Sequence, residues 1–221
     1  TGSGGSRLVS GNNPLNSELE TLLAKIKGTE DAIVFGSGYL ANLGVIPALV
    51  GRKDLILIDE LSHACLFAGA MLSNAHTIHF KHRDISELAN LMTKQRKSYQ
   101  HCLVLTDGVF SMDGDLAPIS ALHELCIKHK AWLMTDDAHG LGVIENGRGS
   151  SVVDGYAIPV PLQVGTLSKA VGAYGGYLCS NKETIDLIRN RARSLVYTTG
   201  LPPGNLAAAI AALKIIGTNI E

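Results

Sequence analysis

Short apolar runs alternate with helical patterns along almost the whole chain, and this alternation constrains the fold more than any other feature. The runs that we predict as strands cover residues 32–35, 55–59, 76–80, 102–107, 131–137, 162–167 and 175–180. The predicted helices cover residues 36–50, 63–75, 84–97, 119–130, 182–195 and 204–217. Strands that alternate with helices indicate a largely parallel sheet with helices on both faces. Because the strands are continuous apolar runs, both faces of the sheet should be buried. The predicted fold class is therefore α/β.

The bulk composition excludes several classes of protein. Of the 221 residues, 46% are hydrophobic and 18% are charged, so the chain can bury a substantial core. The net charge of −1 gives no general attraction to nucleic acid or to an anionic membrane. No apolar run has the length of a membrane-spanning helix, and no signal peptide opens the chain. We therefore expect a cytoplasmic protein without nucleic-acid or membrane partners.

The four cysteines, Cys65, Cys102, Cys126 and Cys179, lie far apart in the sequence and form no CxxC pair. A zinc site requires tighter spacing than this. We expect four reduced cysteines and no metal site.

The two ends of the sequence resemble the interior of a longer protein. The chain opens with TGSGGSR and closes with LKIIGTNIE, where a helical pattern is ending. We expect residues 1–221 to form one large domain that is a fragment of a longer chain.

Ligands of parallel α/β sheets bind beyond the carboxyl ends of the strands, so polar residues at these ends are candidates. Gly36 and Gly38 bracket Ser37 after the first predicted strand, and a helix should begin at about Tyr39. Free N–H groups at a helix start bind anions such as phosphate. The segment lacks the third glycine of a dinucleotide loop and the GK[ST] of a Walker A loop. It predicts either a phosphate site or a tight turn without a ligand.

Asp136 and Asp137 follow another predicted strand, in the segment DDAHG that also contains His139. Two carboxylates are costly to bury unless a cation meets them. We expect Asp136 to pair with a protonated ring nitrogen of a ligand, and Asp137 to have a structural role in a cap or turn.

Lys169 stands among small residues in the segment QVGTLSKAVGAYGG, three residues after Thr166. A lysine amine in a crowded, partly desolvated site can act as a nucleophile or base. Most lysines are instead solvated surface residues. The small neighbours favour the functional interpretation, in which Thr166 adds a hydrogen bond to a phosphate.

Two further polar residues carry little information alone. His63 stands at a predicted helix start, where a cap or a packed ring is the usual role, and Ser111 stands in a turn. Taken with a lysine that can form an imine, an aspartate and a glycine-rich helix start, however, they suggest a site for pyridoxal 5′-phosphate (PLP). We interpret Lys169 as the residue that forms the Schiff base.

Several segments resemble the α-oxoamine synthases, which are fold type I PLP enzymes. The matching segments are GSGGSRLVSG, FGSGYLAN, DELSHAC, DGVFSMDGDLAP, DDAHGLGV, GRGS, GTLSKAVGAYGG and YTTGLPP, in the order of the family. Within the family, DGVFSMDGDLAP and DDAHG are most similar to the 8-amino-7-oxononanoate synthase branch of biotin biosynthesis. The resemblance implies the large domain of a fold type I transferase, without its C-terminal small domain.

The resemblance also implies catalytic roles. Lys169 would bind the cofactor and later move the Cα proton of the substrate, and Asp136 would pair with the pyridine nitrogen. His139 and Ser111 would form hydrogen bonds near the phenolic oxygen. His63 would stack on the ring and touch the substrate. Lys169, His63 and His139 are thus the implied catalytic residues.

The remaining implied contacts are with the cofactor's phosphate. Gly38 and Tyr39 would offer backbone N–H groups, and Thr166 its hydroxyl. Thr198 and Thr199 resemble residues that reach the phosphate of a neighbouring subunit, which implies a homodimer with shared active sites.

The implied reaction is a decarboxylating condensation of L-alanine with pimeloyl-CoA or pimeloyl-carrier protein. Two departures from the family qualify the resemblance: Asn16 stands where a histidine is usual, and Ser168 stands where glycine is common. Segments that bind the acyl thioester and the amino-acid carboxylate in the family have no counterpart here. We expect the 221-residue chain to bind PLP but to turn over poorly or not at all.

Three alternatives stay open on the sequence. The first is another α-oxoamine synthase, of the glycine C-acetyltransferase, 5-aminolevulinate synthase or serine palmitoyltransferase type. The second is a Rossmann domain that binds a nucleotide at GSG, which would leave Lys169 unexplained. The third is a non-catalytic dimerisation fragment.

Overall fold

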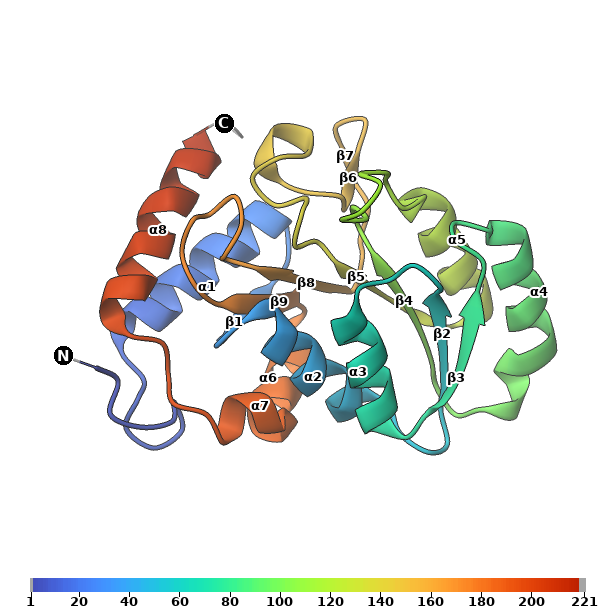
Figure 1. Cartoon of the computed structure of the whole chain (residues 1–221), viewed down its shortest axis with the longest axis horizontal. Coiled ribbons are helices and arrows are strands. Elements are labelled where there is room, and N and C mark those ends of the chain that lie inside the picture. Colours follow the sequence, from blue (N-terminus) through green and yellow to red (C-terminus); the bar gives the residue numbers. More distant parts are fainter. Residues whose placement is uncertain (1, 219–221) are drawn as a thin grey trace.

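The computed structural model describes residues 2–218, and a seven-stranded sheet forms its centre. The strand order is β1-β9-β8-β5-β4-β2-β3 (Figure 1). The strands are β1 (Asp31–Phe35), β2 (Leu55–Asp59), β3 (His76–Phe80), β4 (Cys102–Asp107), β5 (Trp132–Asp136), β8 (Leu162–Thr166) and β9 (Gly176–Ser180). β9 is antiparallel to β1 and β8, and the other pairs are parallel. The predicted α/β fold with a mostly parallel sheet is confirmed.

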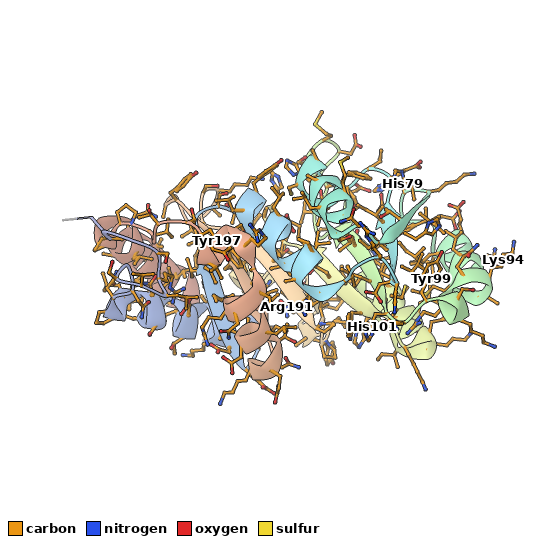
Figure 2. The ribbon with its side chains drawn as sticks, turned by 90° about the horizontal axis from the view of Figure 1, so that it is seen from below. His79, Lys94, Tyr99, His101, Arg191 and Tyr197 are labelled. Atoms are coloured by element: carbon orange, nitrogen blue, oxygen red, sulfur yellow. The ribbon has the colours of Figure 1, made fainter. Side chains whose placement is uncertain are left out.

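Helices cover both faces of this sheet. They are α1 (Pro14–Lys27), α2 (Gly38–Leu49), α3 (Ala64–Ser73), α4 (Ile85–Gln95), α5 (Ile119–His129), α6 (Lys182–Arg191), α7 (Arg193–Val196) and α8 (Pro203–Thr218). Short 3₁₀ turns follow at Arg96–Ser98 and Glu145–Gly147, and a small hairpin joins β6 (Val152–Val153) to β7 (Tyr156–Ala157). Figure 2 looks onto the face that α2, α3 and α6 cover. Among residues 2–218, none of the helices is long and apolar enough to cross a membrane.

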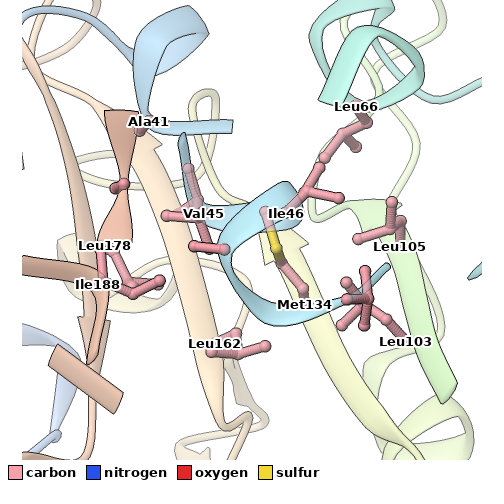
Figure 3. Packing of buried hydrophobic residues seen from close by; sticks show 14 of the residues in the cluster. Ala41, Val45, Ile46, Leu66, Leu103, Leu105, Met134, Leu162, Leu178 and Ile188 are labelled. Atoms are coloured by element: carbon pink, nitrogen blue, oxygen red, sulfur yellow. The ribbon is translucent and has the colours of Figure 1, made fainter. Parts of the chain in front are cut away.

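Alternate residues of the strands pack into different cores. In β2, Ile56 and Ile58 join the cluster under α2, α3 and α6, whereas Leu55 and Leu57 join the cluster under α4 and α5. Figure 3 shows the first cluster, in which Val45 and Ile46 of α2 lie over the strands. A third cluster fills the space between the β1–β9 end of the sheet and helices α1 and α8. Because both faces are buried, neither can be polar, which explains the uninterrupted apolar runs of the sequence.

Two helical segments differ from the prediction. Helix α1 was not predicted, although Asn13 caps it by accepting a hydrogen bond from the N–H of Leu15, and Pro14 occupies its first turn. The helix predicted over residues 182–195 is divided into α6 and α7, because Ala192 has the extended backbone angles φ −70° and ψ 104°.

Candidate active site

A cavity of about 240 Å³ lies at the carboxyl ends of the parallel strands. The structure brings seven of the ten predicted site residues to its wall: Gly38, Tyr39, His63, Asp136, His139, Thr166 and Lys169. They come from the start of α2, the start of α3, the end of β5 and the segment after β8. Parallel strands place their carboxyl ends at one edge, which is how residues so far apart in sequence meet.

The start of α2 forms one side of the cavity. Ser37 caps the helix, and its hydroxyl accepts a hydrogen bond from the N–H of Leu40 at 3.1 Å. The first N–H groups of a helix have no partner within it, and those of Gly38 and Tyr39 belong to residues that line the cavity. Such free N–H groups favour an anion, and the positive end of the helix dipole favours it further.

Glycine is required where this helix start meets the sheet. A Cβ atom added at Gly176 would overlap the carbonyl oxygen of Ser37 and the nitrogen of Gly38. A Cβ at Gly38 would come within 3.1 Å of the Cβ of Thr166. The backbone of the helix start therefore lies directly against β8 and β9, and the hydroxyl of Thr166 stands beside it. This hydroxyl donates to the carbonyl of Gly175 at 2.9 Å and lies 2.8 Å from the Ser168 hydroxyl.

Asp136, the last residue of β5, is buried and firmly held. Its Oδ1 accepts a hydrogen bond from the N–H of Ala138 at 3.0 Å, and its Oδ2 accepts one from Asn42 Nδ2 at 2.7 Å. A carboxylate with these donors, at the wall of a cavity, can pair with a cationic group of a ligand.

Asp107 is a second carboxylate in the cavity wall that sequence reasoning missed. It ends β4 and stands beside Asp136 in the register of the sheet. Burial, and next the charge of Asp136, raise the pKa of Asp107 to about 7. Its Oδ1 accepts a hydrogen bond from the N–H of His63 at 3.3 Å. The rule that singled out Asp136, a polar residue at a strand end, would also have found Asp107.

Lys169 meets His139 across the cavity. Lys169 Nζ lies 2.5 Å from His139 Nε2, which is half-buried. Burial and the adjacent Lys169 cation lower the pKa of His139, so the neutral imidazole is favoured, and its Nε2 can accept a hydrogen bond from the amine. The expected crowding of Lys169 is not found: its side chain is exposed, because the chain turns away from the sheet after β8. The lysine stands at the mouth of the cavity.

His63 combines the two roles that the sequence left open. It is the N-cap of α3, and its Nδ1 accepts a hydrogen bond from the N–H of Cys65 at 3.2 Å. The same residue lines the cavity.

The structure does not bring Ser111, Thr198 and Thr199 to the cavity wall. Ser111 is exposed in the turn after β4, whose base is closed by pairing of Val109 with Leu116. Thr198 and Thr199 line a separate, small cavity together with Asn16. Connecting segments run over the protein surface, and the exposed position of Ser111 in this turn agrees with that.

Asp137 lies on the other side of the strand end and forms a buried ion pair with Lys27 at 2.5 Å. The two side chains are 1% and 0% exposed. Asp137 thus has a structural contact, but through an ion pair with Lys27 of α1 and not through the cap or turn that the sequence suggested. The four cysteines are free and buried, as expected.

The matches to known proteins follow this architecture. Residues 1–220 match the class I and II aminotransferase family. The chain belongs to that family. Within it, the chain is 63% identical over 218 residues to the 8-amino-7-oxononanoate synthase of Granulibacter bethesdensis, covering 99% of this chain and 56% of the relative. It is 62% identical to the protein of the same name from Methylocella silvestris, covering 100% of this chain and 63% of the relative.

A solved structure has the same fold. Serine palmitoyltransferase from S. paucimobilis, bound to a PLP–myriocin aldimine, superimposes with a TM-score of 0.93 and 34% identity. The match covers 98% of this chain and 54% of that one. The chain thus spans little more than half the length of these family members.

Proposed function

We propose that the chain forms the PLP-binding large domain of an 8-amino-7-oxononanoate synthase. The observation that carries the proposal is the identity of 62–63%, over 99–100% of the chain, to two proteins of that name. The substrates would be L-alanine and pimeloyl-CoA or pimeloyl-carrier protein.

The groups around the cavity fit PLP. Asp136 would pair with the pyridine nitrogen, and the N–H groups of Gly38 and Tyr39 would bind the phosphate. The Thr166 hydroxyl would join them by rotating its proton from the Gly175 carbonyl to the phosphate. The packing of Gly176 against this helix start supports the assignment, because it keeps side-chain atoms away from the phosphate position. Lys169 would bind the cofactor covalently through Nζ.

PLP, when bound, supplies an electron sink that stabilises negative charge on the Cα atom of the amino acid. Lys169 Nζ would take the Cα proton, and the neutral His139 beside it would accept a hydrogen bond and so orient the amine. His63, at the start of α3, would cover one face of the cofactor ring and limit the access of water. The Cα atom would form a bond to the thioester carbonyl carbon as the thiolate leaves, and the carboxyl group of the amino acid would depart as carbon dioxide. The electron pair left on Cα would then take a proton back from Lys169 Nζ, which gives the amino ketone.

Other contacts are also part of the proposal. The protein would be a cytoplasmic homodimer with shared active sites, in which Thr198 and Thr199 reach the phosphate bound by the partner subunit. Their position away from the chain's own cavity is compatible with such a contact. Ser111 would contact the phenolic oxygen only if its turn folds inward when the cofactor binds.

A second candidate is a serine-using synthase of the serine palmitoyltransferase type. The TM-score of 0.93 favours it, but the identity of 34% is far below that of the 8-amino-7-oxononanoate synthases. Incubation with L-alanine, glycine and L-serine separates the two, because the preferred amino acid should change the visible spectrum of bound PLP at the lowest concentration.

The experiment that tests the proposal is an absorbance titration with PLP, before and after borohydride treatment. It should be done with the 221-residue chain and with a chimera completed by the remaining segments of the Granulibacter bethesdensis relative. We expect a visible band in the chimera, and irreversible attachment of the cofactor to Lys169 after reduction. Lys169→Ala should lose the attachment, whereas the surface variant Lys214→Ala should keep it. No band in either protein would contradict the proposal.

A further inference from the structure

Two buried side chains, Asn42 and Cys65, lie behind the cavity and converge on Asp136. Asn42 lies on α2, four residues after Gly38, and so on the same side of the helix as the proposed phosphate site. Cys65 lies in the first turn of α3. The side chain of Asn42 is fully buried and Cys65 is 2% exposed, so both belong to the interior of the protein.

The amide of Asn42 is oriented by its acceptors. Asn42 Nδ2 lies 2.7 Å from Asp136 Oδ2, 3.2 Å from the carbonyl oxygen of Gly38 and 3.2 Å from Cys65 Sγ. Its Oδ1 is buried and has no hydrogen-bond partner among the described residues. A buried acceptor without a partner is costly, yet the reverse orientation would be worse because it would place an amide oxygen against the carboxylate. In this orientation Asn42 Oδ1 has no hydrogen-bond partner among the described residues, while Nδ2 donates to Asp136.

The thiol of Cys65 connects His63 with the same carboxylate. Cys65 Sγ lies 2.9 Å from His63 Nδ1 and 3.7 Å from Asp136 Oδ2. Burial, and the charges of Asp136 and Asp107, raise the pKa of Cys65, so it remains a neutral thiol with a proton to donate. Its position fixes the cap of α3 relative to the end of β5.

We propose that Asn42 and Cys65 are positioning residues that fix the carboxylate of Asp136 and stabilise its negative charge against the neighbouring Asp107. This inference rests on the proposed function, in which Asp136 pairs with the pyridine nitrogen of PLP. Hydrogen bonds to a carboxylate favour its charged form, and a charged Asp136 is needed to hold the ring nitrogen protonated. Asn42 and Cys65 would therefore set both the affinity for PLP and the protonation behaviour of the bound cofactor.

The test compares four variants with two controls in the chimera described above. Asn42→Leu keeps the approximate size of the side chain but removes the donor, and Asn42→Ser is a smaller alternative should the leucine variant not fold. Cys65→Val removes the thiol, and Cys65→Ser keeps a donor at the same position. The controls are Thr135→Val, which alters a buried hydroxyl without a partner one residue before Asp136, and Cys126→Ser, a buried thiol on α5.

The measurements are the Kd for PLP, the pH at which the visible absorption of bound PLP titrates, and the Tm of the cofactor-free protein. The titratable groups near Asp136 include Asp107, His63, Cys65, His139, Lys169 and Tyr177, and none of them is altered in the Asn42 variants.

We expect Asn42→Leu or Asn42→Ser to raise the Kd about tenfold or more, as for loss of a hydrogen bond to a charged group, and to shift the titration of the bound cofactor. Cys65→Val should act in the same direction, and Cys65→Ser should restore the titration of the unaltered protein. The controls should leave the Kd and the titration unchanged.

Both Asn42 variants binding PLP with unchanged Kd and titration would overturn the inference, as would a change in Tm alone. Failure of the unaltered chimera to bind PLP would instead refute the proposed function, so the two failures are distinguishable.

Discussion

Replacing Lys27 by methionine should destabilise the protein more than any surface substitution, because it leaves a buried carboxylate without its partner. Lys27 Nζ lies 2.5 Å from Asp137 Oδ2 and donates to the carbonyl of Arg148 at 2.8 Å. Asp137 Oδ1 accepts a hydrogen bond from the N–H of Ser150 at 3.0 Å. Breaking a buried ion pair by removing one partner costs about 3–5 kcal/mol. For a chain of this length, that corresponds to a fall in Tm of roughly 6–20 °C.

The assay is urea unfolding followed by circular dichroism, with Lys27→Met, Asp137→Asn and the double variant. The double variant should be less destabilised than the sum of the two single variants by roughly 2 kcal/mol or more, since no isolated charge remains buried. Lys214→Met is the matched control, because Lys214 pairs with Glu18 at 2.9 Å but its side chain is 59% exposed. Such a surface pair contributes about 0–1 kcal/mol.

Two results would refute this reasoning about the buried pair. One is a decrease in the free energy of unfolding for Lys27→Met that is as small as the decrease for Lys214→Met. The other is strict additivity in the double variant, which would mean that Lys27 and Asp137 act independently. The ion pair also joins the end of α1 to the residue after Asp136, so the Kd for PLP should rise in the same variants.

Two further predictions concern the cavity. Gly176→Ala places a Cβ against the backbone of Ser37 and Gly38, so it should destabilise the protein by about 1–3 kcal/mol and weaken PLP binding. Gly204→Ala should do neither, because a Cβ at Gly204 meets nothing within 4 Å. Equal effects of the two variants in urea unfolding and PLP titration would contradict the close approach of Gly176 to the helix start. Because the pKa of Asp107 is raised from 3.8 to about 7, the folded state holds a proton that the unfolded state has lost, and stability should fall as the pH rises between about 4 and 7. Asp107→Asn should reduce this slope, which is on the order of 1 kcal/mol per pH unit for one group, and an unchanged slope in urea unfolding at several pH values would show that Asp107 is not its source.

Much of the sheet could be predicted because local pattern determines it. Three strands, at residues 55–59, 76–80 and 102–107, have the predicted bounds, and the other four differ by one residue at one or both ends. Buried parallel strands need apolar side chains on both faces, and this demand is visible in any window of the sequence. The break at Ala192 was missed because nothing in the local composition opposes a continuous helix.

The site could be predicted only in part. Seven candidate residues reach the cavity because each follows a strand or begins a helix at the same edge. Ser111 also follows a strand, yet it stands in a solvent-exposed turn, since its position depends on how the turn closes. The crowded, partly desolvated surroundings expected for Lys169 are not found, because its small neighbours leave space around the side chain.

The sequence alone determined the strands, most of the helices, and which polar residues stand at the ends of the strands. Only the tertiary structure decided which of these residues meet. Asn42 and Asp136 are 94 residues apart, and Lys27 and Asp137 are 110 apart, yet each pair is in contact. The periodicity of the sequence indicates on which face of a helix or strand a side chain lies. A contact between two elements depends instead on the order of the strands and the placement of the helices. Those follow from packing of the whole chain, which a local pattern does not contain.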